Sequence, residues 1–370
     1  MRTQRRTGKA RARQGGRLNG IHGLLPRTVL LTMLLVGAWL VDAAGAPPEG
    51  AGAPPEPAAT PRSGPETKVT PELERAVQRG LDYLARTQRP DGAWSDSSYG
   101  QLSGVVGLAM MAFLAHGETA DDPKYGPVVR RAVDYIVRTQ SENGLLSGSG
   151  GSPMYSHGFA TLALAEVYGT IDDPRVGPAL KKAVGLIVSS QNRLGGWRYS
   201  VDSTDADTTV SGAQMVALRA AANAGIEVPE ETIRRGVAFY KSCYCPGGGF
   251  GYTGPQGPGR ARAGIGLLVL SLSGEYRSAE AKATADFLMA QSGDPSYFYY
   301  AAYYCSQAMF QAGGRYWRAW NETMTPALVG MQQADGSWGG DNSSGGVTAG
   351  TAMALLAIEI NYNLLPIYQR

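Results

Sequence analysis

Cysteine and histidine are scarce in this sequence of 370 residues. The three cysteines, Cys243, Cys245 and Cys305, are an odd number that gives no disulfide framework. They form no CxxC pair of the kind that holds zinc, and three histidines leave little material for a histidine-rich metal centre. We therefore expect neither a metal nor a cofactor.

An excess of positive charge is also missing once the first residues are set aside. The formal net charge is +3, but eight Lys and Arg lie within residues 1–27 and one acid, Asp42, lies within residues 1–45. The remaining chain has 26 basic and 30 acidic residues, a net charge of −4. This balance implies no basic face, so we expect no nucleic-acid partner.

One apolar run follows the basic stretch near the N-terminus. Residues 28–41 read TVLLTMLLVGAWLV, which is short for a membrane-spanning helix and suits the core of a signal peptide. We predict that residues 1–45 are a signal peptide and that the protein is exported, to the periplasm or the extracellular space. An uncleaved N-terminal membrane anchor, which would hold the protein near a membrane, is the alternative.

Residues 46–69 are rich in Ala, Pro, Gly and Glu. Such a segment cannot bury enough apolar surface to fold, so we predict a disordered linker. The linker leads into one large repeat domain over residues 70–370.

An amphipathic helix recurs along this domain at intervals of about fifty residues. The six copies end at Gln88, Gln140, Gln191, Cys243, Gln291 and Gln332. Most copies lead into a turn rich in glycine and aromatic residues, as in QRPDGAW and QNRLGGW. Pairs such as Asp-Gly supply the positive φ that ends a helix, and the aromatic ring can wedge between neighbouring hairpins.

Each turn is followed by a second helix of different composition. Sequences such as GVVGLAMMAFLA (104–115) and GTAMALLAIEI (350–360) are apolar almost all round. A helix without a polar face is buried on all sides, whereas the first helix of each pair carries a polar stripe. We predict an all-α fold, an (α/α)6 toroid of six helical hairpins with inner and outer helix rings. An open solenoid is the alternative, but it needs polar capping repeats, and none is obvious.

The Gln…Gly-Trp turns resemble the QW motifs of squalene–hopene and oxidosqualene cyclases. The architecture is also similar to that of the β subunits of protein prenyltransferases. The resemblance covers roughly residues 70–370 and implies a terpene cyclase-like or prenyltransferase-like toroid. A squalene cyclase has two helical domains and this chain has length for one, which implies a single-domain relative or a non-catalytic cousin. Prenyltransferases hold zinc with an Asp-x-Cys pair, which this sequence lacks.

The segment DSTDADTTVSG (202–212) resembles the Asp-x-Asp-Asp motif of the cyclases, whose middle aspartate protonates an alkene or epoxide. Asp205, Asp207 and Thr208 occupy the matching positions, so the last aspartate is a threonine. The match makes Asp207 the candidate catalytic acid and Asp205 its partner. A carboxyl crowded by another and enclosed by apolar walls has a raised pKa. The alternative is that Asp207 caps the following inner helix.

Further candidates lie at the starts of the inner helices. These helices run the same way, so their N-terminal ends should meet at one mouth of the ring and favour an anionic or polar ligand group. The candidate substrate-binding residues there are Ser103, His157, Arg262, Tyr300 and Thr348. Tyr303 and Tyr304 share a helix face with Tyr300, and such aromatic faces can stabilise a carbocation. A structural role in packing or hydrogen bonding is the alternative for each.

We interpret the protein as an isoprenoid cyclase or as a binder of an isoprenoid or other lipid, held in an apolar central cavity. If it is an enzyme, the expected reaction is an acid-initiated intramolecular cyclisation. A non-catalytic toroid that binds protein or glycan is the first alternative. A polysaccharide-active toroid is the second, and it needs two carboxylates, for which only Asp205 and Asp207 are candidates.

Overall fold

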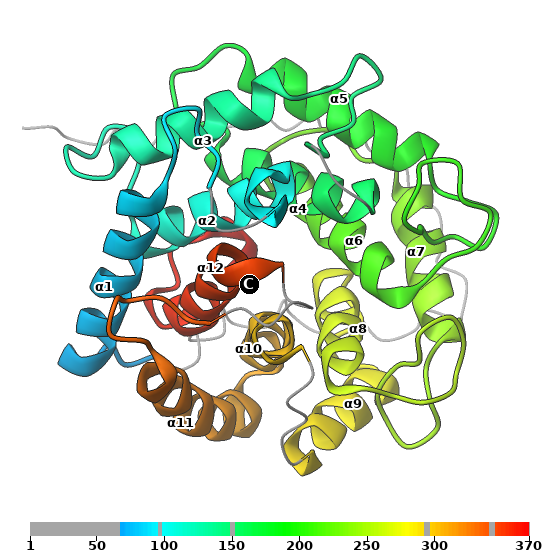
Figure 1. Ribbon diagram of the computed structural model, residues 1–370. Helices are drawn as coiled ribbons and strands as arrows, with labels where there is room; N and C mark the ends of the chain where they lie inside the picture. The colour runs from blue at the N-terminus through cyan, green and yellow to red at the C-terminus, as the bar shows by residue number, and fades with distance from the viewer. Residues whose placement is uncertain (1–66, 95–97, 149–151, 292–296, 340–344, 370) are drawn as a thin grey trace, which may run out of the picture. The chain divides into compact units, whose positions relative to one another are not determined.

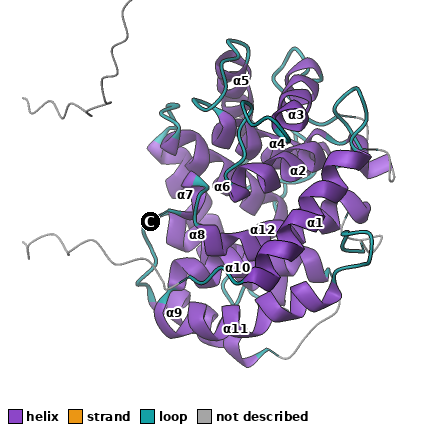
Figure 2. Cartoon of the chain, turned by 90° about the vertical axis from the view of Figure 1, so that its left-hand side faces the viewer, coloured by secondary structure: helices purple, strands orange, loops and turns teal. Residues whose placement is uncertain are grey.

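The computed structural model describes residues 67–94, 98–148, 152–291, 297–339 and 345–369, all in the unit that begins at residue 61. The described residues form twelve α-helices and three short 3-10 helices, and they contain isolated β-bridges but no strand (Figure 2). No helix in this part of the chain is long and apolar enough to cross a membrane. The predicted signal peptide and almost all of the predicted linker lie outside it.

The helices alternate between two concentric rings (Figure 1). The outer ring consists of α1 (Pro71–Thr87), α3 (Gly126–Arg138), α5 (Val176–Ser189), α7 (Glu230–Ser242), α9 (Ala279–Ala290) and α11 (Gly314–Met331). The inner ring consists of α2 (Ser103–His116), α4 (Pro153–Val167), α6 (Thr208–Asn223), α8 (Arg260–Leu272), α10 (Phe298–Ala312) and α12 (Gly346–Glu359). Each inner helix packs against the next, and α12 packs against α2, so the inner ring is closed. The predicted all-α toroid of six helical hairpins is confirmed.

The outer helices lie on the outside of the ring because their sequences are amphipathic. In α1, the buried side chains include Leu73, Val77, Leu81 and Leu84, which recur at helical spacing and form one stripe. Thr70 caps its N-terminus by accepting a hydrogen bond from the backbone N–H of Leu73 at 3.2 Å. The remaining face is exposed to solvent, so the helix stays on the outside.

Small residues allow the inner helices to approach closely. A Cβ on Gly104 of α2 would lie 2.7 Å from the Cα of Ser156 in α4. A Cβ on Gly212 of α6 would lie 2.1 Å from Cγ2 of Ile265 in α8. A larger side chain at either position would force the two helices apart, which explains why these apolar helices contain so much glycine and alanine.

The repeated glutamines connect neighbouring hairpins. Nε2 of Gln88 donates to the carbonyls of Gly92, in its own turn, and Val128, in the next outer helix, both at 3.1 Å. Gln140, Gln191 and Gln332 make the same pair of bonds in their own repeats. For Gln332 the next outer helix is α1, because Nε2 donates to the carbonyl of Ala76 at 2.8 Å. The last repeat is therefore fastened to the first by the bonds that join the others.

Glycine and tryptophan complete each connection. Gly336 has φ +90°, and a Cβ there would lie 2.4 Å from the carbonyl oxygen of Arg79 in α1. The indole of Trp338 is fully buried and donates to the carbonyl of Leu328 at 2.7 Å. Trp94 and Trp197 make the equivalent bond in the first and third repeats. Each indole is thus bonded to the outer helix of its own hairpin, and Trp338 also lies against α1 of the next hairpin, where a Cβ on Gly80 would be 2.9 Å from its Cζ3.

The C-terminal segment covers the end of the ring where the inner helices finish. It contains η2 (Ile360–Tyr362) and η3 (Pro366–Tyr368), which pack against inner helices including α2, α6, α10 and α12. The hydroxyl of Tyr368 donates to the carbonyl of Leu356, and the backbone N–H of Ile367 lies 3.4 Å from Oε2 of Glu166. Leu365, Ile367 and Tyr368 are buried, so this segment closes that end.

Candidate functional site

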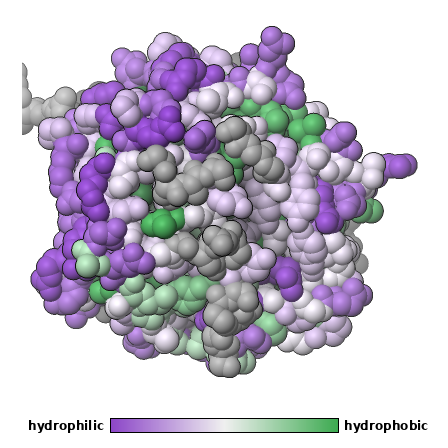
Figure 3. Space-filling model, viewed as in Figure 1, coloured by the Kyte–Doolittle hydropathy of each residue, from purple (hydrophilic) through white to green (hydrophobic). Residues whose placement is uncertain are grey.

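The opposite end of the inner ring holds a pocket of about 580 Å³. It is lined by the first turns of all six inner helices, as expected if their N-terminal ends meet at one mouth. On the face viewed in Figure 1, hydrophilic side chains gather at the periphery, and paler and hydrophobic residues lie nearer the middle (Figure 3). The mouth therefore leads from a polar surface into the centre of the toroid.

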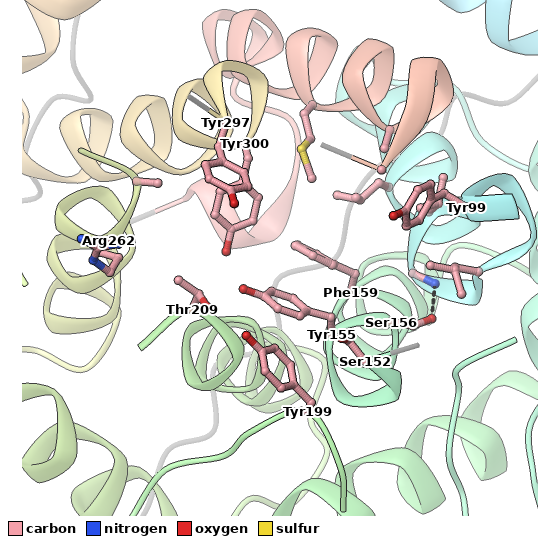
Figure 4. Close-up of a pocket in the computed structure, with 18 of the residues that line it drawn as sticks. Tyr99, Ser152, Tyr155, Ser156, Phe159, Tyr199, Thr209, Arg262, Tyr297 and Tyr300 are labelled. Carbon is pink, nitrogen blue, oxygen red and sulfur yellow. Dashed lines mark hydrogen bonds between the residues drawn. The ribbon is translucent and has the colours of Figure 1, made fainter. Parts of the chain in front are cut away.

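The pocket has an apolar half and a polar half. The apolar side chains come mainly from α2, α4 and α12: Leu102, Val105, Leu108, Phe159, Ala349 and Met353. The polar side chains come from α4, α6, α8, α10 and two loops: Tyr155, Tyr199, Thr209, Tyr252, Arg262 and Tyr300. In the close-up, Tyr155, Tyr199 and Thr209 direct their hydroxyl groups toward a common space, into which Tyr300 also extends (Figure 4). The lining suits a ligand with one apolar and one polar end.

The phenols are hydrogen-bond donors at any ordinary pH. Burial raises the pKa of Tyr155 and of Tyr300 above the usual value for tyrosine. The hydroxyls of Tyr199 and Tyr252 are bonded to each other and join two loops at the mouth. The hydroxyl oxygen of Tyr300 is buried and has no hydrogen-bond partner. The Tyr155 hydroxyl is close enough to act on the pKa of Tyr300, so a ligand oxygen would compete with Tyr155 for this donor.

Arg198, Asp205 and Asp207 form an ion-pair cluster next to the polar side chains of the pocket. The guanidinium of Arg198 lies over the rings of Tyr199 and Tyr252, 5.0 and 5.3 Å from their centroids. It pairs with Oδ2 of Asp205 at 2.8 Å, and its Nε lies 3.5 Å from Oδ2 of Asp207. Asp205 is mostly exposed, whereas Asp207 is fully buried. Neither aspartate lines the pocket itself.

Asp207 is the N-cap residue of α6. Its Oδ1 accepts hydrogen bonds from the backbone N–H groups of Thr209 and Val210, both at 2.8 Å, and from the Thr209 hydroxyl at 2.6 Å. Its other oxygen, Oδ2, is buried without a hydrogen-bond partner and lies 3.5 Å from Nε of Arg198. Thr209 lines the pocket, so its hydroxyl stands between Asp207 and a ligand.

Three other candidates do not line the pocket. Nδ1 of His157 accepts from the backbone N–H of Leu146, and Nε2 donates to the carbonyl of Ala183, both at 3.1 Å. Burial lowers the pKa of His157 to about 4, so the ring is neutral and ties α4 to α5. The hydroxyl of Ser103 lies 3.1 Å from that of Thr139. Ser103 and Thr348 are both buried, and neither lines the pocket.

Of the tyrosines on α10 that the sequence singled out, one lines the pocket and two are packed behind its wall. Arg262 and Tyr300 are the sequence-predicted residues that the structure places in the pocket wall. Tyr303 and Tyr304 are buried next to Tyr300, with ring centroids 4.8 Å apart from each other and 5.0 Å between Tyr300 and Tyr304. Both pack against Phe159 at about 6 Å, so they support the wall instead of forming it.

Sequence reasoning missed several wall residues. Tyr155 and Thr209 each lie two positions from a residue that was singled out, and helix periodicity alone does not reveal which neighbour faces the cavity. Tyr252 lies in the glycine-rich turn GGGFGYTG, where an aromatic residue had been expected to pack between hairpins. Among the described residues, no group of three His, Cys, Asp or Glu could hold a metal ion.

The described residues form an (α/α)6 toroid with a pocket at one mouth, and comparison with known proteins agrees with this fold. Residues 103–263 match the squalene-hopene cyclase C-terminal domain family. Lanosterol synthase of Aspergillus fumigatus is 28% identical over 141 residues, which are 34% of this chain and 17% of that protein. Drimenyl diphosphate synthase of Streptomyces showdoensis is 29% identical over 140 residues, 36% of this chain and 25% of that protein. The resemblance to the terpene cyclase superfamily is confirmed.

The matched segment spans a quarter or less of the length of these relatives, so their whole activities do not transfer with it. A solved structure of similar fold is a family 76 glycoside hydrolase from a bovine Bacteroides thetaiotaomicron strain. It has a TM-score of 0.59 and 12% identity, and the match covers 78% of this chain and 77% of that one. This likeness is one of fold.

Proposed function

We propose that the protein binds an isoprenoid or related lipid in the pocket at the mouth of its ring. The observation that carries the proposal is the combination, in one pocket wall, of apolar side chains on α2, α4 and α12 with hydroxyl groups and a guanidinium on α4, α6, α8 and α10. A lipid chain would lie against Leu108, Phe159 and Met353, with its polar end toward Tyr155 and Thr209. Similarity to two terpenoid synthases supports a ligand of this class.

Acid-initiated cyclisation is a second candidate function. The observation in its favour is the hydrogen bond from the Thr209 hydroxyl to Asp207, which leaves one hydroxyl group between the candidate acid and the pocket. Against it stands the position of Asp207, which caps α6 through Oδ1 and does not line the pocket where an alkene would have to receive the proton. Ligand binding is therefore the leading proposal.

Cleavage of a polysaccharide receives no specific support. A glycosidase of the usual kind places two carboxylates on either side of the bond it cleaves. Within the described wall of the pocket there is no carboxylate, and Asp205 is turned outward toward Arg198. We also propose that the protein is exported, on the basis of its basic N-terminal stretch and the apolar run at residues 28–41.

Native mass spectrometry of protein purified from its source cells tests the binding proposal, together with titration of the purified protein with farnesol. We expect a bound lipid and saturable binding of the probe. Ala349→Phe should weaken binding at least tenfold by filling the apolar half, at a stability cost of about 1–3 kcal/mol. The same substitution at the exposed Ala279 should leave binding unchanged. Absence of lipid together with no saturable binding refutes the proposal.

The cyclisation candidate is tested by Asp207→Asn in an assay for cyclic products from linear terpenoids. Asn caps a helix about as well as Asp, so the fold should survive. Turnover in the wild type that disappears in this variant would establish the acid role. Turnover that persists, or wild-type protein that binds the probe without converting it, leaves binding alone as the function.

A further inference from the structure

Among the described residues that line the pocket, Arg262 is the only one with a charged side chain. It lies in the first turn of α8 and is half-buried. Its Nη2 donates to the carbonyl of Gly257 at 2.5 Å, and its Nε lies 3.4 Å from the carbonyl of Phe250. A guanidinium has five N–H donors, so these bonds fix the group in place and leave donors for a ligand.

The charge of Arg262 is not compensated within the described part of the chain. No described carboxylate pairs with it, whereas the neighbouring Arg198 pairs with both Asp205 and Asp207. The four internal segments outside the described residues contain no lysine or arginine. The part of the pocket wall that the structure describes therefore presents a single positive charge.

Tyr300 supplies a second donor in the same pocket. Its hydroxyl is buried near that of Tyr155 and makes no hydrogen bond of normal geometry, and a buried donor without a well-placed acceptor is destabilising. The Thr209 hydroxyl donates to Asp207, so toward a ligand it can only accept. A ligand oxygen that accepts from Tyr300 would give this donor a well-placed acceptor.

We infer that the ligand carries one carboxylate group, held by Arg262 and Tyr300 at the polar end of the pocket. The inference rests on the proposed function, because the apolar half is taken to hold the lipid chain. The two oxygens of a carboxylate match the planar donors of a guanidinium, and its single charge balances that of Arg262. An alcohol leaves the arginine unpaired, and a diphosphate brings more negative charge than one guanidinium neutralises.

Three probes with the same chain distinguish these head groups: farnesoic acid, farnesol and farnesyl diphosphate. Calorimetric titration of the full chain at pH 7.5 should show the acid binding roughly tenfold or more tightly than the alcohol, as a charge-assisted hydrogen bond predicts. Affinity for the acid should fall below about pH 4.5, where the probe becomes protonated. The diphosphate should bind more weakly than the acid.

Variants of two neighbouring arginines assign the effect to Arg262. Arg262→Gln should weaken the acid about tenfold and leave farnesol within about twofold, and Arg262→Lys should restore part of the loss. Arg260 is the matched control, because it lies in the same turn of α8, stacks on Trp320 at 5.1 Å and does not line the pocket. Arg260→Gln should leave all three affinities unchanged.

The outcomes distinguish failure of the carboxylate inference from failure of the proposed lipid binding. If acid and alcohol bind equally, or the diphosphate binds most tightly, the carboxylate inference is overturned while lipid binding stands. If Arg262→Gln weakens acid and alcohol alike, Arg262 acts only through the loop carbonyls it holds, and the inference also fails. If none of the probes binds, the proposed function itself fails.

Discussion

Removing the hydrogen bonds between the last repeat and the first should show how much ring closure contributes to stability. Gln332→Ala removes the amide that donates to the carbonyls of Ala76 and Gly336, at 2.8 and 2.9 Å. It also removes the acceptor for Nε of Arg79 at 3.0 Å. The first and third of these contacts cross from the sixth repeat to α1, so the substitution acts directly on the closure.

The expected cost follows from what the glutamine bonds. Each hydrogen bond contributes about 0.5–1.5 kcal/mol net, and a buried carbonyl left without its donor costs more than that. The exposed arginine adds little. We expect a loss of about 2–3 kcal/mol, which lowers the melting temperature of a domain of this size by about 4 °C.

Two further variants provide the comparison. Gln140→Ala removes the equivalent pair of bonds inside the ring, to the carbonyls of Gly144 and Ala179 at 3.0 and 2.9 Å. In a closed ring both interfaces are internal, so the two variants should lose similar stability in urea-induced unfolding and keep one cooperative transition. Gln333→Ala, at the exposed neighbour, should change stability by less than about 0.5 kcal/mol.

The closed ring would be refuted if Gln332→Ala and Gln140→Ala lost unequal amounts of stability. If the α1–α11 contact does not form in solution, Gln332→Ala should cost much less than Gln140→Ala, because only the bond within its own turn would be lost. A separate early transition for the terminal hairpins in either variant would point the same way.

Two other predictions concern a buried acid and the N-terminus. Glu359 is fully buried without a hydrogen-bond partner, and burial raises its pKa well above the usual value, so the folded state keeps a proton that the unfolded chain loses near pH 4.3. Stability should therefore fall as pH rises above that point, and Glu359→Gln should reduce this slope by about 1.4 kcal/mol per pH unit in urea titrations that start at pH 5 and rise from there. An unchanged slope would contradict the buried, protonated state. If the protein is exported and its leader removed, N-terminal sequencing of the mature protein should begin near residue 45, and an intact Met1 on cytosolic protein would refute that.

A substitution at Glu166 separates the contributions of the two buried acids. Burial raises the pKa of Glu166 to about 7, so it adds to the same slope from near pH 4.3 up to about pH 7 and not above. Glu359→Gln should therefore leave a residual slope that ends near pH 7. The doubly substituted protein should have neither component.

The fold could be predicted because its signals are local and repeated. Gln88, Gln140 and Gln191 recur at nearly equal intervals, and each ends a helix by bonding a glycine carbonyl four residues later. One turn of this kind says little, but several in register specify hairpins of equal length. The closure between Gln332 and Ala76 follows from the same repetition.

The site could be predicted only in part, because the inner helices are apolar all round and give no sign of which face meets the cavity. Arg262 and Tyr300 line the pocket, whereas Tyr303, three residues after Tyr300, is buried behind the wall. His157 is turned outward by its bonds to Leu146 and Ala183, which join two helices and have no sequence signature. Tertiary packing decides these directions.

The C-terminal segment was not predicted as a distinct element. The pattern of apolar residues ends near Ile360, and nothing in the residues that follow indicates that they fold back over the ring. Their position depends on distant partners, such as the Gln311 amide that donates to the carbonyl of Tyr368 at 3.1 Å. Contacts of this kind arise only once the toroid has formed.

This covering segment makes the pocket a dead end. Because Tyr368 is buried across the other end of the ring, a molecule that enters between Tyr155 and Arg262 must leave through the same opening. If the pocket holds a ligand, as we propose, a bound molecule blocks its own replacement until it leaves. Exchange should follow the release of the previous occupant, and long chains cannot thread through the ring as they would through a tunnel open at both ends.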